Sequence, residues 1–208
     1  MTFRNTLLGA AAAVGLVLSA GAANASIIAT LNGITNSVTH PGSFDFGYSA
    51  TLAADEQIAT GSYLVLYDWG PVLNPVPTAS TGIVATNFAF AQQYSGPTPQ
   101  FTDPTDSASV LNVVATYTGD TVSGFALGDG ASGNLGTFVL TSPLGGSRMG
   151  ALQGSQAQHF NPAGTNTGTI DANITTTTAP AAVPEPASLA ILGGTLALAG
   201  VVRRRRKA

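Results

Sequence analysis

The last 26 residues of the chain combine three features in an order that a soluble protein core does not accommodate. A short proline-containing motif at residues 183–188 precedes an uncharged apolar stretch at residues 189–202, and five cations follow directly. These cations are Arg203, Arg204, Arg205, Arg206 and Lys207. Burying five adjacent positive charges without counter-charges is very costly, so we expect the apolar stretch to lie in a membrane instead of a folded interior.

The apolar stretch is short for a membrane span. Extended to residues 187–202, it forms about 24 Å of helix, against a hydrocarbon core of about 30 Å. The long side chains of the basic run can reach the headgroups and supply part of the missing length. Because such cations stay on the cytoplasmic side, we predict a single transmembrane helix at 187–202 and a basic stop at 203–207.

The other end of the chain has the features of a signal peptide. Arg4 precedes an uncharged h-region at residues 7–20, and Ala23 and Ala25 form a small-x-small cleavage site. Cleavage after Ala25 makes Ser26 the first residue of the mature chain. These features predict export by the Sec machinery, with the middle of the chain on the periplasmic side of the inner membrane before any further processing.

The C-terminal segment resembles the PEP-CTERM sorting signal of Gram-negative bacteria. The residues that carry the resemblance are Val183, Pro184, Glu185, Pro186, Ala187 and Ser188, followed by the apolar span and the basic stop. The resemblance implies recognition by an exosortase, transient anchoring in the inner membrane and cleavage near the motif. It also implies delivery to the cell surface or the extracellular matrix, and association with extracellular polysaccharide or biofilm.

The segment between the two processing signals, residues 26–182, is strongly acidic. It contains nine acidic residues and a single basic one, Arg148, which gives a net charge of −8 against −3 for the whole chain. A surface of this sign repels nucleic acid and anionic lipid, so no nucleic-acid partner is expected. The chain has no cysteine, which excludes disulfides, thiol catalysis and thiolate metal sites.

The pattern of this segment is typical of β-strands. Residues Ser43–Leu52 alternate apolar and polar side chains with a period of two. Seven further strands are expected, at Ile27–Leu31, Tyr63–Trp69, Ile83–Tyr94, Ser109–Tyr117, Thr121–Leu127, Leu135–Thr141 and Thr169–Thr175. No amphipathic helix is evident. We therefore predict an all-β fold, a single jelly-roll-like β-sandwich.

These observations divide the chain into four parts. The signal peptide covers residues 1–25 and the β-sandwich ectodomain covers 26–174. A Thr/Ala/Pro-rich segment at 175–182 is expected to be a flexible stalk. The sorting signal covers 183–208.

The segment contains no recognisable catalytic motif. Residues 128–133 have the spacing of a dinucleotide-binding loop, but strand-like residues follow where that loop needs a helix, so a hairpin loop is favoured. His40 and His159 both lie beside loop signals and are expected to be exposed. Two histidines and a carboxylate could hold zinc, although no local ligand spacing supports such a site.

A glycoside hydrolase would need two suitably spaced carboxyl groups. Glu56 is the only glutamate between residues 26 and 182, so a pair would have to use an aspartate, with Asp45 and Asp68 as candidates. Solvated aspartates on strands are commoner than such pairs. We therefore assign no catalytic, cofactor-binding or metal-binding residue, and expect a protein that is not an enzyme.

Two kinds of ligand remain open. Asp103, Asp106, Asp120 and Asp129 lie in loops, where carboxylate oxygens suit calcium, although solvated turn aspartates have the same pattern. Trp69 and the five tyrosines could form a stacking platform for sugar rings or could belong to the core.

Three functions are therefore compatible with the sequence. A structural or adhesive surface protein is the leading one, because the polar residues of residues 26–182 are not clustered. A carbohydrate- or calcium-dependent binding module is the alternative, and a polysaccharide hydrolase comes third.

Overall fold

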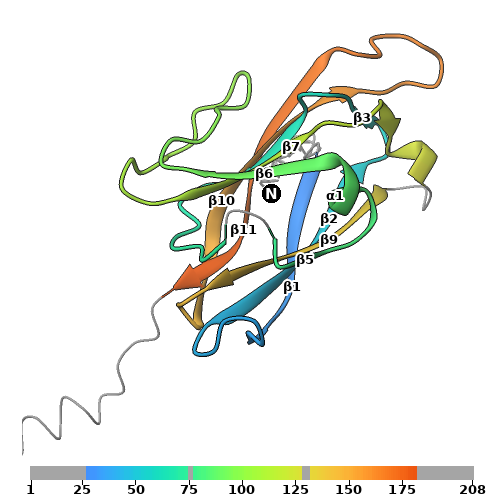
Figure 1. Cartoon of the computed structure of the whole chain (residues 1–208). Helices are drawn as coiled ribbons and strands as arrows, with labels where there is room; N and C mark the ends of the chain where they lie inside the picture. Colours follow the sequence, from blue (N-terminus) through green and yellow to red (C-terminus); the bar gives the residue numbers. More distant parts are fainter. Residues whose placement is uncertain (1–26, 75–76, 128–131, 182–208) are drawn as a thin grey trace, which may run out of the picture.

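The computed structural model describes residues 27–74, 77–127 and 132–181, which form two antiparallel β-sheets (Figure 1). The predicted signal peptide, transmembrane helix and sorting signal lie outside the described residues. Within the described ranges, no helix has the length and apolar character needed to cross a membrane. The all-β prediction is confirmed, whereas the jelly-roll topology is not.

The first sheet has four strands in the order β1-β2-β9-β5. These strands are β1 (Ile27–Asn36), β2 (Phe44–Ala53), β9 (Ser132–Ser142) and β5 (Ala79–Ser80). The period-two pattern of β2 is the reason for its place at the centre: Phe46, Tyr48, Ala50 and Leu52 are all buried on one face.

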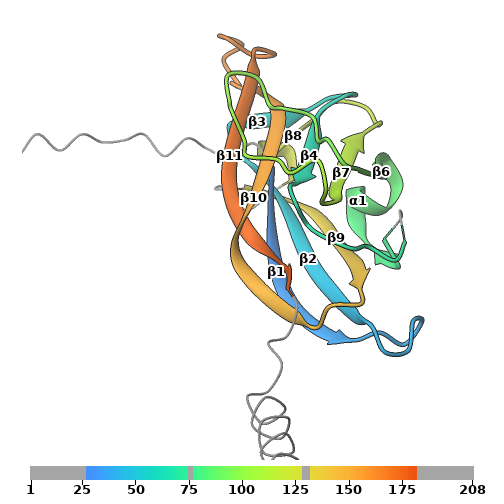
Figure 2. The ribbon, with the colours of Figure 1, turned by 90° about the vertical axis from the view of Figure 1, so that its left-hand side faces the viewer.

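The second sheet has seven strands, with six in the order β6-β7-β4-β10-β3-β8 and β11 beside β10. They are β3 (Glu56–Ile58), β4 (Tyr63–Leu66), β6 (Phe88–Gln93), β7 (Asn112–Tyr117), β8 (Val122–Ser123), β10 (Gly146–His159) and β11 (Ile170–Ala181). Figure 2 shows β10 and β11 as a long curved pair. Both β4 and β3 pair with the other edge of β10, one after the other along its length.

The core lies between the two sheets and takes side chains from both. Tyr48 of β2 stacks on Phe138 of β9, with ring centroids 5.2 Å apart. Trp69, which follows β4, meets Phe46 edge-on at 5.6 Å. Large rings at this position supply the buried apolar area that a chain without disulfides needs.

One predicted strand is wrong in its first half. Residues Gly82–Asn87 form a short helix, α1, and the strand β6 begins only at Phe88. Gly82 has a φ of +63°, and a Cβ there would lie 2.8 Å from the carbonyl oxygen of Leu135. The turn at this glycine breaks the extended conformation that Ile83 and Val84 would otherwise favour.

The prediction for Thr121–Leu127 is also too long. Only Val122–Ser123 form a strand, and a 3-10 turn occupies Phe125–Leu127. The chain turns at Gly124, whose N–H donates to the carbonyl oxygen of Glu56 at 2.7 Å. Added to Gly124, a Cβ would lie 2.0 Å from the carbonyl oxygen of Ala53, so this close approach requires glycine.

The longest strand of the structure, β10, was not predicted. Its sequence consists of small, polar and flexible residues and has no Val, Ile, Thr or aromatic residue. Its inward positions are Ala151, Gln153, Ser155 and Ala157, all buried. Two of these four are polar, so their alternation is not visible as hydrophobic periodicity.

The predicted stalk is likewise incorrect over most of its length. Residues 175–181 form the second half of β11 and pair in register with β10, up to Gly146 opposite Ala181. Ala179 is 0% exposed and belongs to the core. The ectodomain therefore extends to residue 181, because the threonines and alanines of this segment fit a paired strand with alternate positions buried.

A set of hydrogen bonds, here called the polar seam, links the first sheet to the second along β1. The N–H of Ile27 donates to Ser155 Oγ at 3.1 Å, and the N–H of Ala29 donates to Gln153 Oε1 at 2.9 Å. Thr177 Oγ1 donates to the carbonyl oxygen of Ala29 at 2.9 Å. The buried polar groups of β10 thus satisfy backbone groups of β1 that no neighbouring strand pairs within the described residues.

Candidate functional site

Trp69 is not a surface platform for sugars. Its side chain is 0% exposed, and its Nε1–H donates to Tyr48 Oη at 2.8 Å. Tyr67 and Tyr117 are also buried, whereas Tyr94 is 57% exposed. Because ring stacking on a sugar needs an open face, the core interpretation of Trp69 is correct.

The aspartates that are possible calcium ligands do not come together within the described residues. Asp106 accepts hydrogen bonds from the N–H of Gly96 at 2.8 Å and from Asn112 Nδ2 at 2.9 Å, so it fastens its own loop. Asp103 and Asp120 are exposed. Asp129 lies outside the described residues. No three of these aspartates form a group that could hold a metal in the described part of the chain.

The two aspartates considered for glycoside hydrolysis have separate structural partners. Asp45 Oδ1 on β2 accepts a hydrogen bond from Thr141 Oγ1 on β9 at 2.7 Å. Asp68 Oδ1 accepts the N–H of Ser107 at 3.0 Å, and its carbonyl oxygen accepts a hydrogen bond from Arg148. Each carboxylate holds a strand or loop in place, which is a structural task.

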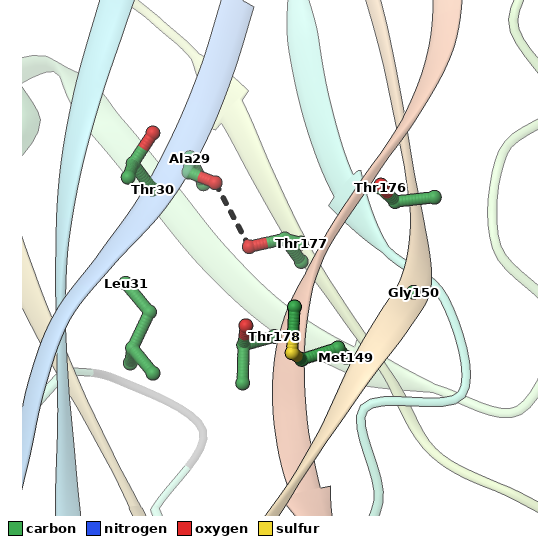
Figure 3. Close-up of a pocket in the computed structure, with 8 residues that line it drawn as sticks. All are labelled: Ala29, Thr30, Leu31, Met149, Gly150, Thr176, Thr177 and Thr178. Carbon is green, nitrogen blue, oxygen red and sulfur yellow. Dashed lines mark hydrogen bonds between the residues drawn. The ribbon is translucent and has the colours of Figure 1, made fainter.

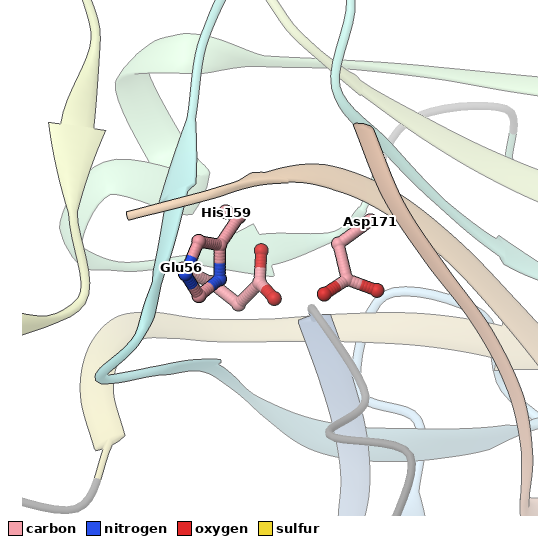
Figure 4. A group of neighbouring side chains, drawn as sticks. All are labelled: Glu56, His159 and Asp171. Carbon is pink, nitrogen blue, oxygen red and sulfur yellow. The ribbon is translucent and has the colours of Figure 1, made fainter. Parts of the chain in front are cut away.

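The structure brings together three residues that the sequence did not connect: Glu56, His159 and Asp171 (Figure 4). His159 lies directly opposite Glu56 across the β10–β3 pair. Asp171 lies opposite Ala157, two residues before His159 on the same strand. Because opposed residues and residues two apart share a face, all three side chains point to the same side of the second sheet.

The three side chains converge closely. One ligand atom from each, a ring nitrogen of His159 and carboxylate oxygens of Glu56 and Asp171, all lie within 4.8 Å of one another. In Figure 4 the Glu56 carboxylate lies between the imidazole and the Asp171 carboxylate. His159 is thus half-buried at a strand end, so the prediction of an exposed loop histidine is wrong for this residue. His40, the other histidine, lies in the predicted loop, between β1 and β2, but it is half-buried as well and not exposed.

Glu56 is in an unusual electrostatic position. Its side chain is 0% exposed, and neither carboxylate oxygen has a hydrogen-bond donor among the described residues. Burial raises the pKa of Glu56 to about 9, with further contributions from the carboxyl group of Asp171 and from Asp55. An unpartnered buried carboxylate is strongly unfavourable. At neutral pH, Glu56 must therefore either keep a proton or be neutralised by a cation.

A shallow pocket lies beside this cluster. It has a volume of about 370 Å³ and is lined by Asp55, His159 and residues 160–162, together with Ala54. His159 thus belongs both to the pocket wall and to the buried cluster.

A second pocket lies between the edge of β1 and the β10–β11 pair, with a volume of about 290 Å³ (Figure 3). Its walls include Leu31, Met149, Thr176 and Thr178, and it lies beside the Thr177–Ala29 hydrogen bond of the polar seam. The lining has no charged residue and no aromatic ring. It therefore lacks both the stacking surface and the carboxylates that specific sugar recognition or hydrolysis would use.

The comparison with protein-family models decides the nature of the C-terminus. Residues 182–207 match the model of the PEP-CTERM protein-sorting motif. The chain carries a PEP-CTERM sorting signal. It is therefore an exosortase substrate, exported across the membrane and processed for the cell surface. No curated protein and no solved structure matches the chain.

The PEP-CTERM match begins one residue after the last residue of β11. The folded ectodomain and the sorting signal are thus contiguous, without the eight-residue stalk predicted between them. The residues predicted for sorting, Val183 to Ser188, and the basic stop, Arg203 to Lys207, all fall within the matched range. The signal-peptide cleavage residues Ala23, Ala25 and Ser26 lie outside the described residues.

Proposed function

We propose that the ectodomain of this PEP-CTERM protein has a structural or adhesive role at the cell surface or in the extracellular matrix, without catalysis. The observation that carries the proposal is the sorting motif at residues 182–207, which directs the chain to the exosortase. The proposed route starts with Sec export and signal-peptide removal before Ser26. The helix at 187–202 then anchors the chain in the inner membrane, with the ectodomain in the periplasm, until processing.

Three features of the ectodomain support this role. The net charge of −8 over residues 26–182 keeps such a surface soluble and disfavours binding to anionic partners. The two aspartates that are candidates for a catalytic pair, Asp45 and Asp68, hold strands and loops in place, and so does Asp106, a candidate calcium ligand. The fold depends on packing and hydrogen bonds instead of disulfides, so it does not need an oxidising compartment.

Association with extracellular polysaccharide is part of the proposal, but not through Trp69, which is fully buried. An extended all-β surface with a long outer strand, β11, suits contacts distributed over many weak sites. We accordingly expect matrix association to survive any single surface substitution.

The test is made in the cells that produce the protein. Three strains are compared: the parent, one whose chain ends at Ala182, and one in which residues 27–181 are replaced by an unrelated exported domain with the sorting signal retained. We expect the parent protein in the surface or matrix fraction. Its intact mass should correspond to a chain that starts at Ser26 and ends near Pro184. The chain that ends at Ala182 should bypass exosortase processing and lose its surface association.

The domain replacement separates delivery from function. If the ectodomain has the proposed role, the replacement strain sorts its protein normally but loses matrix cohesion or biofilm mass. Normal biofilm in that strain would overturn the matrix role and leave sorting intact. A parent protein that still ends at Ala208 in the inner membrane would instead overturn the proposed route.

A further inference from the structure

We propose that Glu56, His159 and Asp171 form a binding site for a divalent transition-metal ion of the zinc type. The site would join three strands of the second sheet, because Glu56 belongs to β3, His159 ends β10 and Asp171 follows the first residue of β11. It is independent of the sorting signal and of the matrix role.

The first support is the buried carboxylate itself. Glu56 is completely buried, and both its oxygens lack a donor among the described residues, although the carboxylate lies between His159 and Asp171 (Figure 4). Solvated surface carboxylates do not have this arrangement, since water satisfies them. A buried acceptor with no donor requires a proton or a cation at that point.

The second support is the charge balance. Two carboxylates and one neutral imidazole have a total charge of −2, so a divalent cation makes the group neutral. Neutral groups can be buried at far lower cost than charged ones. A second carboxylate beside a buried one is otherwise strongly unfavourable, unless the pair shares a proton.

The ligand set indicates which kind of ion binds. Zinc accepts His nitrogen and Asp or Glu oxygen at about 2.0–2.2 Å, with three protein ligands and a solvent molecule as a common arrangement. Calcium instead takes six to eight oxygen ligands, which this cluster does not supply. Tetrahedral zinc brings its ligand atoms to about 3.4 Å from each other. The three ligand atoms lie within 4.8 Å of one another, so zinc binding would require them to move closer together.

The register of the sheet explains why the site would be preformed. The backbone positions of all three ligands are fixed by strand pairing: Glu56 opposite His159, and Asp171 opposite Ala157. The N–H of His159 also donates to the carbonyl oxygen of Thr169 at 2.8 Å, which holds the end of β10. A pocket lined by His159 and Asp55 lies beside the cluster, although Glu56 and Asp171 are not part of its lining.

The test uses the purified protein after treatment with a chelator and dialysis. Zinc binding is followed by calorimetry, and cobalt binding by its visible absorption, which reports on nitrogen and oxygen ligands. We expect one equivalent of Zn²⁺ per chain, a higher melting temperature with Zn²⁺, and a much smaller effect of Ca²⁺. Glu56→Gln and His159→Gln should each weaken Zn²⁺ binding by about a hundredfold or more.

Matched controls separate the site from adventitious surface binding. His40→Gln removes the other histidine, and Asp120→Asn removes an exposed aspartate; neither should change Zn²⁺ affinity. If Glu56→Gln fails to fold, Asp171→Asn tests the site instead, because Asp171 is only half-buried. If the ligand variants bind Zn²⁺ as well as the parent does, binding occurs elsewhere and the proposal is overturned.

A different result would identify the alternative. If Zn²⁺ does not bind the parent and Glu56→Gln is more stable than the parent, the two carboxyl groups share a proton and the site is not a metal site. In that case the substitution Glu56→Gln has replaced a buried carboxyl group, which had no cation as a partner, by a neutral amide.

Discussion

The indole N–H of Trp69 donates to the hydroxyl of Tyr48 at 2.8 Å, and that hydroxyl in turn donates to the carbonyl oxygen of Thr178 at 2.6 Å. This relay connects the loop after β4, through Tyr48 of β2, to β11, the last strand of the described residues. It therefore fastens the C-terminal end of the ectodomain, next to the sorting signal, to the middle of the core.

The first prediction concerns this relay. Tyr48→Phe keeps the ring that stacks on Phe138, but leaves the Trp69 N–H and the Thr178 carbonyl without a buried partner. We expect a loss of about 1–3 kcal/mol in the free energy of unfolding. Denaturant unfolding, followed through the fluorescence of the single tryptophan, measures it.

The control for this substitution is Tyr94→Phe, which removes a hydroxyl from an exposed ring. Its effect should stay within about 0.5 kcal/mol. Equal effects of the two substitutions would show that the relay contributes nothing to stability.

The second prediction is a loss of stability at alkaline pH. Burial raises the pKa of Tyr48, Tyr67, Tyr63 and Tyr117 above the ordinary value of 10.0. The folded protein then holds these protons more tightly than the unfolded chain does. The contribution is fully present below pH 10 and is lost as the pH rises above it, because only the unfolded chain releases the protons.

Melting temperatures between neutral pH and strongly alkaline pH test this expectation. The melting temperature should fall steeply above pH 10, and the fall should be shallower in Tyr48→Phe than in the parent. Tyr94→Phe serves as the control and should follow the parent curve. A flat profile, or identical slopes in all three proteins, would contradict the assignment to buried tyrosines.

The third prediction concerns the polar seam. Gln153 accepts the N–H of Ala29 through Oε1 and donates to the carbonyl oxygen of Thr176 through Nε2, at 2.9 and 3.2 Å. Gln153→Leu has a similar volume but satisfies neither group. We expect a loss of about 1–3 kcal/mol, with β1 becoming the first strand to exchange its amide protons.

Gln156→Leu is the matched control on the same strand. Gln156 points to the opposite face and accepts the exposed N–H of Gln100. The loss in the free energy of unfolding should be smaller for Gln156→Leu than for Gln153→Leu, because water can replace the contact with Gln100. Hydrogen exchange at the N–H of Ala29 distinguishes the two variants, because only Gln153→Leu removes the partner of this amide.

How far the sequence predicts this fold depends on how each strand is buried. β2 alternates large apolar and polar residues, so its position and its inward face could be read directly. β10 fills its inward face with Gln153, Ser155 and small alanines, and its two polar side chains accept hydrogen bonds from the backbone of β1. Such a strand carries little hydrophobic signal.

The candidate metal site could not be predicted from the spacing of residues in the sequence, for a related reason. Glu56, His159 and Asp171 are far apart in the chain, and no short motif joins them. They meet only because β10 pairs with β3 on one edge and with β11 on the other. Since β10 itself was not predicted, its two neighbours could not be aligned. The single signal available was Glu56, the only glutamate of the ectodomain, which is the first residue of the short strand β3.

The last prediction concerns where the ectodomain ends. Residues 175–181 pair with β10, Ala179 is completely buried, and Thr178 accepts the hydrogen bond of Tyr48. A chain that ends at Ala181 should fold, whereas one that ends at Ile174 should be unfolded or quickly degraded by protease. The lost strand half removes contacts comparable to the total stability of a domain, which is about 5–15 kcal/mol.

Circular dichroism and limited proteolysis of these two chains give the comparison. A stable fold in the shorter chain would restore the stalk interpretation of residues 175–182. If instead the longer chain alone folds, processing of the PEP-CTERM signal must occur after Ala181, since a cut within β11 would unfold the ectodomain that the signal delivers. The intact mass of the surface-delivered protein should accordingly include every residue of β11.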